Sequence, residues 1–186
     1  MKTNRIVAIA ISGAAAFFMM GTMQRAFAQD RAPLSSEDKH FISEAAEGGL
    51  AEVELAHLAA DKGESARVKE FGQRMVTDHS QANDKLKDIA QKLGVSVPDH
   101  MSATEYAEKT KLKAYSGGHF DRAYMDAMVK DHQDDIAAFR REARDGQNPE
   151  IKAFAAKTLP TLEQHLHLAE RVNGEITRQA SAGGSH

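Results

Sequence analysis

The chain contains no cysteine and no tryptophan, and only four prolines among its 186 residues. Without cysteine it has no disulfide, no thiolate metal site, no cysteine nucleophile and no lipidated N-terminal cysteine. Nine histidines are present, so any metal site must be built from imidazole and carboxylate groups. The hydrophobic fraction of 41% and the charged fraction of 27% are typical of a globular protein.

The first 28 residues have the three parts of a cleavable secretory signal. Lys2 and Arg5 form a basic start, residues 6–20 are an uncharged run of apolar and small residues, and Ala26–Ala28 fits the signal peptidase site. The run is shorter than the roughly 20 residues needed to span a bilayer, which favours cleavage over an uncleaved anchor. We therefore predict a periplasmic or secreted protein.

Removing this signal changes the charge of the chain. The segment carries three basic residues and no acid, so the mature chain has 158 residues and a net charge of −6. An acidic chain is a poor candidate for binding nucleic acid or anionic lipid. No later segment is apolar enough to cross a membrane, so we expect no stable membrane insertion after cleavage. Envelope association and the oligomeric state are left open.

The rest of the chain is predicted to be all-α. Serine and asparagine N-caps and terminal glycines mark helices at 35–63, 65–94, 119–145 and 148–179, and a capping box opens a short helix at 102–117 that Gly117 and Gly118 close. A kink is expected at Pro160. Short links make antiparallel neighbours and one long link permits a crossover, so we predict a ferritin-like four-helix bundle with a long crossover that contains the short helix between the second and third long helices.

The predicted domain organisation follows from these elements. Residues 1–28 form the signal, 29–34 a flexible N-terminus, 35–179 the bundle and 180–186 a disordered tail. A weak echo between residues 75–79 and 128–132 indicates two related helical hairpins. Gly48 and Gly49 are interpreted as permitting close helix approach.

Each long helix places one polar residue in or beside its apolar stripe. His79, His132 and His165 fall inside the stripes of their helices, and Glu52 lies at the edge of the first one. All four lie near the middle of helices of similar length. One inward polar group per helix at one level is how bundles build internal metal sites, and this ligand set suits one ion of zinc, iron, copper or manganese.

Residues beside these candidates are assigned supporting roles. Asp78 and Asp131 each precede a histidine and lie about 100° round the helix, which suits hydrogen bonding to a ligand better than ligation. The Tyr124 hydroxyl is expected to reach the histidine layer, and Asp135 shares a helix face with His132. The same groups could instead form a metal-free polar network.

Four segments in order carry a resemblance to a known family. Gly48–Val53, Met75–His79, Gly118–Tyr124, and Ala156–Pro160 followed by His165 resemble the bacterial exported family catalogued as domain of unknown function 4142. The resemblance runs from about residue 36 to 172 and implies a ferritin-like fold in an exported, often periplasmic or envelope-associated protein without an established activity. The positions that match the family's motifs are Glu52, His79, Phe120, Asp121, Tyr124, His132, Pro160 and His165.

Enzymatic function is disfavoured by one missing pattern. Di-iron carboxylate bundles need a Glu-x-x-His pair on each of two helices, and the two matches in this chain, Glu37 to His40 and Glu54 to His57, both lie in the first predicted helix. No catalytic residue is predicted. The leading hypothesis is a non-enzymatic, stress-related exported protein whose buried histidine layer binds one transition-metal ion. The alternatives are a metal-dependent redox enzyme and a structural or interaction protein with a metal-free polar core.

Overall fold

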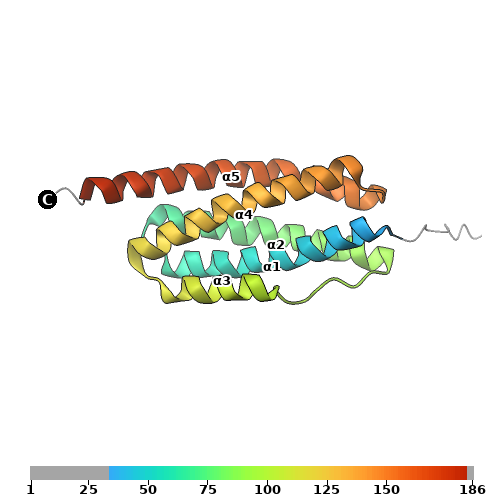
Figure 1. Cartoon of the computed structure of the whole chain (residues 1–186), viewed down its shortest axis with the longest axis horizontal. Helices are drawn as coiled ribbons and strands as arrows, with labels where there is room; N and C mark the ends of the chain where they lie inside the picture. Colours follow the sequence, from blue (N-terminus) through green and yellow to red (C-terminus); the bar gives the residue numbers. More distant parts are fainter. Residues whose placement is uncertain (1–33, 184–186) are drawn as a thin grey trace, which may run out of the picture. The chain divides into compact units, whose positions relative to one another are not determined.

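The computed structural model describes residues 34–183, and every regular element in that range is an α-helix (Figure 1). The helices are α1 (Ser36–Lys62), α2 (Ala66–Leu93), α3 (Ala103–Ala114), α4 (Gly117–Asp145) and α5 (Pro149–Gly183). The all-α class is confirmed for this part of the chain. The predicted signal and residues 29–33 of the predicted flexible N-terminus lie outside the described residues.

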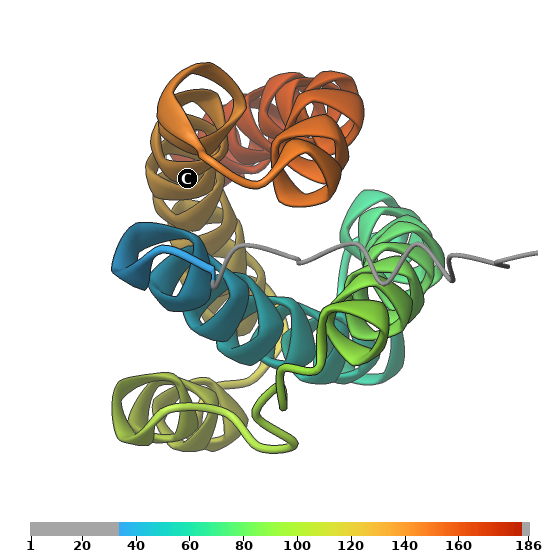
Figure 2. The same cartoon turned by 90° about the vertical axis from the view of Figure 1, so that its right-hand side faces the viewer.

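The four long helices form two hairpins that pack against each other. Three-residue links join α1 to α2 and α4 to α5, and Figure 2 shows α3 on the outside of the α1–α2 hairpin. The long link between α2 and α4 returns the chain along α1, so that α3 ends where α1 ends. There the Lys62 ammonium donates to the carbonyl oxygens of Lys113 and Tyr115, both at 2.6 Å.

Local signals in the sequence set the helix starts. The hydroxyls of Ser35 and Ser65 accept from the backbone N–H groups of Asp38 and Arg67. Ser102 and Glu105 form the expected capping box at the start of α3. Each of these bonds satisfies an N–H that has no partner within its own helix.

Two helix ends differ from expectation. Ala114 ends α3, and Gly117 begins α4 with a positive φ of 57°, so the glycine pair opens the long helix and does not close the short one. At the other end of the chain α5 continues past Gln179 to Gly183. Residues 180–183, predicted to lie in a disordered tail, are therefore helical.

Helix α5 also runs through Pro160 without ending. Proline removes one backbone hydrogen bond and strains the preceding turn. The helix is buried on both sides of it, with Ile151 and Leu162 in one apolar cluster and Ala169 and Val172 in the other. Tertiary burial therefore holds the two parts of α5 as one element.

The core consists of two apolar clusters separated by a polar layer. One cluster includes Phe71, Tyr124 and Met128, and the other includes Phe139 and Phe154. On each long helix one buried polar residue lies between the residues that belong to the two clusters. These four residues are Glu52, His79, His132 and His165.

Two buried aspartates tie each hairpin to the loop of the other. Asp38, in the first turn of α1, accepts from the N–H groups of Gln147 and Asn148 at 3.0 and 3.2 Å. Asp121, near the start of α4, accepts from those of Glu64 and Ser65 at 3.0 and 2.7 Å. The two contacts are reciprocal, so they fix the register of α1 against α4.

The aspartate contacts and the similar segments 75–79 and 128–132 match different helices of the two hairpins. Asp38 lies 14 residues before Glu52, and Asp121 lies 14 residues before Asp135. The corresponding positions are therefore in α1 and α4, the first helices of the hairpins. The similar segments 75–79 and 128–132 instead match α2, the second helix of its hairpin, with α4, the first helix of the other.

None of the helices within residues 34–183 is long and apolar enough to cross a bilayer.

Candidate metal centre

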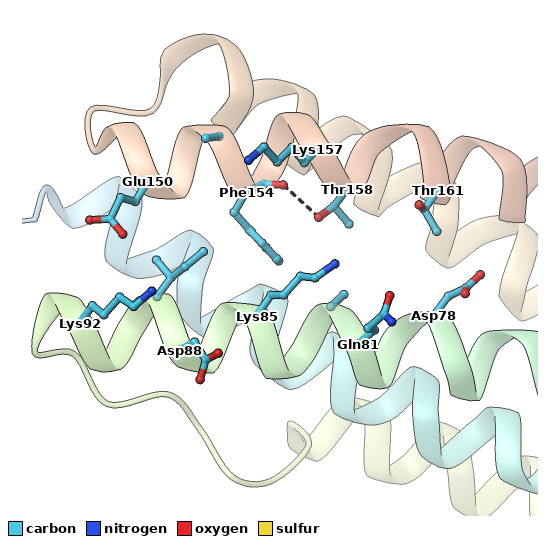
Figure 3. Close-up of a pocket in the computed structure, with 13 residues that line it drawn as sticks. Asp78, Gln81, Lys85, Asp88, Lys92, Glu150, Phe154, Lys157, Thr158 and Thr161 are labelled. Carbon is cyan, nitrogen blue, oxygen red and sulfur yellow. Dashed lines mark hydrogen bonds between the residues drawn. The ribbon is translucent and has the colours of Figure 1, made fainter.

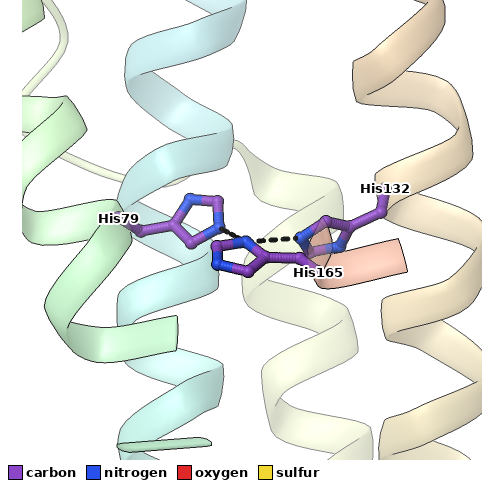
Figure 4. A group of neighbouring side chains, drawn as sticks. All are labelled: His79, His132 and His165. Carbon is purple, nitrogen blue, oxygen red and sulfur yellow. Dashed lines mark hydrogen bonds between the residues drawn. The ribbon is translucent and has the colours of Figure 1, made fainter. Parts of the chain in front are cut away.

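The structure brings the four predicted ligands together at the centre of the core. Glu52 comes from α1, His79 from α2, His132 from α4 and His165 from α5, and none is more than 6% exposed. Figure 4 shows the three imidazoles pointing toward one another. One ring nitrogen from each histidine lies within 4.8 Å of the others.

The spacing of these nitrogens matches what a metal ion requires. His79 Nε2 lies 3.2 Å from His165 Nδ1, and His132 Nε2 lies 3.4 Å from the same atom. A tetrahedral ion with metal–nitrogen bonds of 2.0–2.1 Å separates its ligand nitrogens by about 3.3 Å. Two of the three nitrogen–nitrogen distances among the histidines are therefore already close to the value that such a site requires.

The other nitrogen of each ring contacts a hydrogen-bond acceptor. His165 Nε2 lies 2.8 Å from Asp78 Oδ2, His132 Nδ1 lies 3.0 Å from the Met128 carbonyl, and His79 Nδ1 lies 2.6 Å from Glu52 Oε2. A neutral imidazole has one N–H. If each ring donates outward, all three inner nitrogens present lone pairs to the same point, which is how proteins orient histidine ligands.

Burial keeps these rings in the form that binds metal. It lowers the pKa of His79, His132 and His165 to about 4 in each case, although Asp135, Glu52 and Asp78 respectively act in the opposite direction. The imidazoles are therefore neutral near pH 7.

Glu52 has one oxygen free to act as a fourth ligand. Its Oε2 contacts His79, whereas its buried Oε1 has no hydrogen-bond partner and lies 3.6 Å from His132 Nε2. Burial raises the pKa of Glu52 to about 7. Burial and the Glu52 charge also raise the pKa of Asp135 well above its usual range. Both shifts favour the neutral form of these carboxyl groups, whereas a bound cation would favour the charged form.

A metal-free arrangement is also consistent with these contacts. Protonated Glu52 can donate to His79 Nδ1, and His79 Nε2 can then donate to His165 Nδ1, whose ring donates to Asp78. The chain of donors is continuous, but it gives no proton to His132 Nε2. Glu52 is thus protonated in the metal-free network, whereas it would be ionised as a metal ligand.

The predicted supporting residues have different positions. Asp78 bonds His165 and is itself held by Arg74 at 3.3 Å. Asp131 has no hydrogen bond to any of the three histidines within the described part of the chain; its pKa is raised to about 6 by burial and by Glu108. It acts on Glu52 through charge alone.

The Tyr124 hydroxyl makes no hydrogen bond to the histidine layer. Among the described residues this buried hydroxyl has no hydrogen-bond partner. Its ring stacks on Phe120 at 5.9 Å and meets Phe71 edge to face at 6.1 Å. The ring packing fixes where the hydroxyl points, so Tyr124 is a core residue here and not a support for a ligand.

Sequence reasoning missed two contributors to the site. Asp135 was placed on the face of His132, but only the packing of α4 against α1 brings it beside Glu52. The Met128 carbonyl, which orients His132, is a main-chain group. Any residue at that position would supply it, so no side-chain pattern could have pointed to it.

Fold and site together define, within residues 34–183, an all-α protein with a buried cluster of three histidines from α2, α4 and α5 and one glutamate from α1. Residues 23–172 match the family model described as domain of unknown function DUF4142. The chain belongs to this family, as its motifs predicted. No curated protein matches the chain.

Solved structures of two other helical proteins share the fold. A DUF305 fragment from Deinococcus radiodurans superposes with a TM-score of 0.69 at 15% identity, over 77% of this chain and 99% of that one. A DUF305 protein from Streptomyces coelicolor gives a TM-score of 0.65 at 14% identity, over 76% and 94% of the two chains. At these identities the likeness concerns the fold alone.

Proposed function

We propose that this protein is an exported metal-binding protein with a ferritin-like bundle, which holds one transition-metal ion through His79, His132 and His165 with Glu52 as the fourth ligand. Zinc, iron, copper and manganese are the candidate ions. The observation that carries the proposal is the convergence of three ring nitrogens whose opposite nitrogens each contact an acceptor.

A metal ion accounts for the site better than the metal-free network. In the donor chain described above, the inner nitrogen of His132 receives no proton, and Oε1 of Glu52 has no hydrogen-bond partner among the described residues. Leaving such atoms unpaired costs roughly 1–3 kcal/mol each. One cation would engage both atoms and would also relieve the repulsion among the converging lone pairs.

Metal analysis of matched histidine variants tests this proposal. The mature chain, made without a histidine tag, is exposed to each of the four metals, dialysed and assayed by mass spectrometry. His165 is fully buried in the layer, whereas His167 on the same helix is exposed. We expect one ion per chain in the parent and in His167→Gln, and its loss in His165→Gln. Equal retention by both variants, or none in the parent, would refute the proposal.

Export is the second part of the proposal and is supported by the signal-like pattern at the N-terminus. It predicts that the full-length chain, expressed in a Gram-negative host, is recovered in the periplasmic fraction with Gln29 as its first residue. A cytoplasmic protein that retains residues 1–28 would contradict export without affecting the metal site.

A further inference from the structure

A small chamber adjoins the candidate metal site. Its inner wall includes Glu52, His79 and Asp135, and its outer wall includes Phe154 and Thr158. The chamber volume is about 20 Å³, and a cavity of roughly 10–15 Å³ already holds one water molecule. The unpaired Oε1 of Glu52 and the carboxyl of Asp135 are polar partners for such a molecule.

A larger groove lies between α2 and α5, on the other side of the chamber's outer wall (Figure 3). Its volume is about 560 Å³, and it shares Ala82, Phe154 and Thr158 with the chamber. The same three side chains therefore form the boundary between solvent and the buried site.

Phe154 is the largest side chain of this boundary. Its side chain points from α5 toward α2 (Figure 3) and is 5% exposed. Its carbonyl oxygen accepts from Thr158 Oγ1 at 2.9 Å within the continuous helix α5. Because the backbone is helical here, a side-chain rotation is the simplest motion that would connect the groove to the chamber.

Charge at the groove mouth does not select a particular ion. The mouth carries equal numbers of basic and acidic side chains, namely Lys85, Lys92, Lys157, Asp78, Asp88 and Glu150. The narrowest part of the route is the chamber itself, so size is the selective property.

We propose that the α2–α5 groove is the entrance to the metal centre, and that Phe154 gates the passage of small exogenous ligands. The ligand class is water or an anion of very few atoms with an oxygen or nitrogen donor. The inference rests on the proposed function for the identity of the inner site. The route itself is a property of the chain with or without metal.

Three variants separate gating from general loosening of the core. Phe154→Leu removes the ring from the gate, and Ala82→Leu adds bulk at the same boundary. Phe41→Leu is the matched control, because Phe41 belongs to the same apolar cluster and is similarly buried at 6% exposure, but does not line the chamber. Urea unfolding of each variant establishes that it is folded.

The first measurement uses copper(II)-loaded protein and azide. Azide is larger than a chamber sized for one water, so its binding rate depends on displacement of the gate. Stopped-flow absorbance of the azide-to-copper band should show binding about tenfold faster in Phe154→Leu and slower in Ala82→Leu, a change in barrier of about 1.4 kcal/mol for the former. Phe41→Leu should bind azide at the parent rate.

The second measurement needs no metal. Deuterium exchange at the C2 position of His79, followed by mass spectrometry in metal-free protein, reports the access of water to the chamber. It should be faster in Phe154→Leu than in the parent or Phe41→Leu.

The outcomes distinguish this inference from the proposed function. Stoichiometric copper with equal azide rates and equal exchange in all variants would overturn the gate and leave the metal site intact. Absence of all four candidate metals, with faster His79 exchange in Phe154→Leu alone, would support the route and refute the metal site. Equal acceleration by Phe154→Leu and Phe41→Leu would mean that the core opens generally, which also overturns the gate.

Discussion

Two aspartates that look equivalent in the sequence have different roles at the level of single residues. Asp78 and Asp131 each stand directly before a histidine of the site. Only Asp78 reaches a ring, and the ring it reaches is that of His165, on another helix. Adjacent positions on a helix point apart, so an aspartate next to a ligand in sequence can serve only a ligand across the core.

This difference predicts unequal effects of the same substitution. Asp78→Asn removes the anionic acceptor that orients His165, and we expect metal affinity to fall by about 10–100-fold. Asp131→Asn removes the same charge without breaking a bond to a ligand, and it should change affinity much less. Competition with a chromophoric chelator measures both constants. Equal losses in the two variants would show that net charge, and not hydrogen bonding, supports the site.

Glu142, far from the histidine layer, makes a pH-dependent contribution to the free energy of unfolding. Burial and the neighbouring Asp38 raise its pKa to about 7 from 4.5. The folded state therefore binds more protons than the unfolded state between these values, and this contribution to stability is present below pH 4.5 and is lost as the pH rises to 7.

Glu142→Gln tests the direction of this effect, because glutamine cannot ionise. The free energy of unfolding of the parent, minus that of the variant, should decrease steadily from pH 4.5 to pH 7. Urea titrations with a chelator present measure both proteins across this range. A difference that does not depend on pH would mean that Glu142 ionises normally in the folded state.

At the scale of elements, close helix approach depends on a glycine that the sequence pattern did not single out. A Cβ at Gly72 would lie 2.7 Å from the Ala56 carbonyl oxygen and 2.9 Å from the Ala60 nitrogen, both backbone atoms of α1. A Cβ at Gly48 would meet only a Glu105 oxygen at 3.7 Å, an ordinary contact, whereas a Cβ at Gly49 would collide with Asn83 Oδ1 of α2. The predicted close approach therefore holds for Gly49 and not for Gly48, and the α1–α2 hairpin closes over Gly72 and Gly49.

Alanine at Gly72 and alanine at Gly48 should have opposite effects. Gly72→Ala forces α1 and α2 apart and should destabilise the protein by about 1–3 kcal/mol. Gly48→Ala gains helix propensity without a clash and should stabilise it by up to about 1 kcal/mol. Thermal and urea unfolding measure both. Stabilisation by Gly72→Ala would show that the hairpin relaxes without loss of packing.

The contact of Asp121 with the α1–α2 loop predicts a second effect at this scale. Asp121→Ala leaves the N–H groups of Glu64 and Ser65 without their charged acceptor, and we expect a loss of about 1.5–3 kcal/mol in unfolding free energy. Asp134 lies on the same helix and, among the described residues, pairs only with exposed Lys130. Asp134→Ala should cost no more than about 1 kcal/mol. Similar losses for the two would argue against a specific link between the hairpins.

For the whole molecule, the site joins every long helix at one point. Because each ligand comes from a different helix, an ion bound only by the folded state should raise the unfolding free energy by about 2.7 kcal/mol at a free metal concentration one hundred times Kd. The urea midpoint of the parent should rise with metal concentration, and that of His165→Gln should not. A midpoint that stays constant despite bound metal would place the ion on the surface or equally on the unfolded chain.

The sequence by itself determined the helices and which polar residues face inward. Caps such as Ser35 and Ser65 and the three-four spacing of apolar residues are local features, because a helix needs only near neighbours to form its hydrogen bonds. The same spacing set the angle and height of Glu52 and the histidines. Local reasoning failed at Gly117 and at the end of α5, where neighbouring elements decide how far a helix continues.

Only the tertiary structure decided how the polar residues are used. Which nitrogen of His79 faces His165 and why Asp135 interacts more closely with Glu52 than Asp131 does both depend on the register between helices. That register is set by contacts between residues far apart in the chain, including the two aspartate–loop links and the approach at Gly72. A shift of one helical turn between two helices would preserve every local pattern and separate the ligands, since one turn is about 5.4 Å.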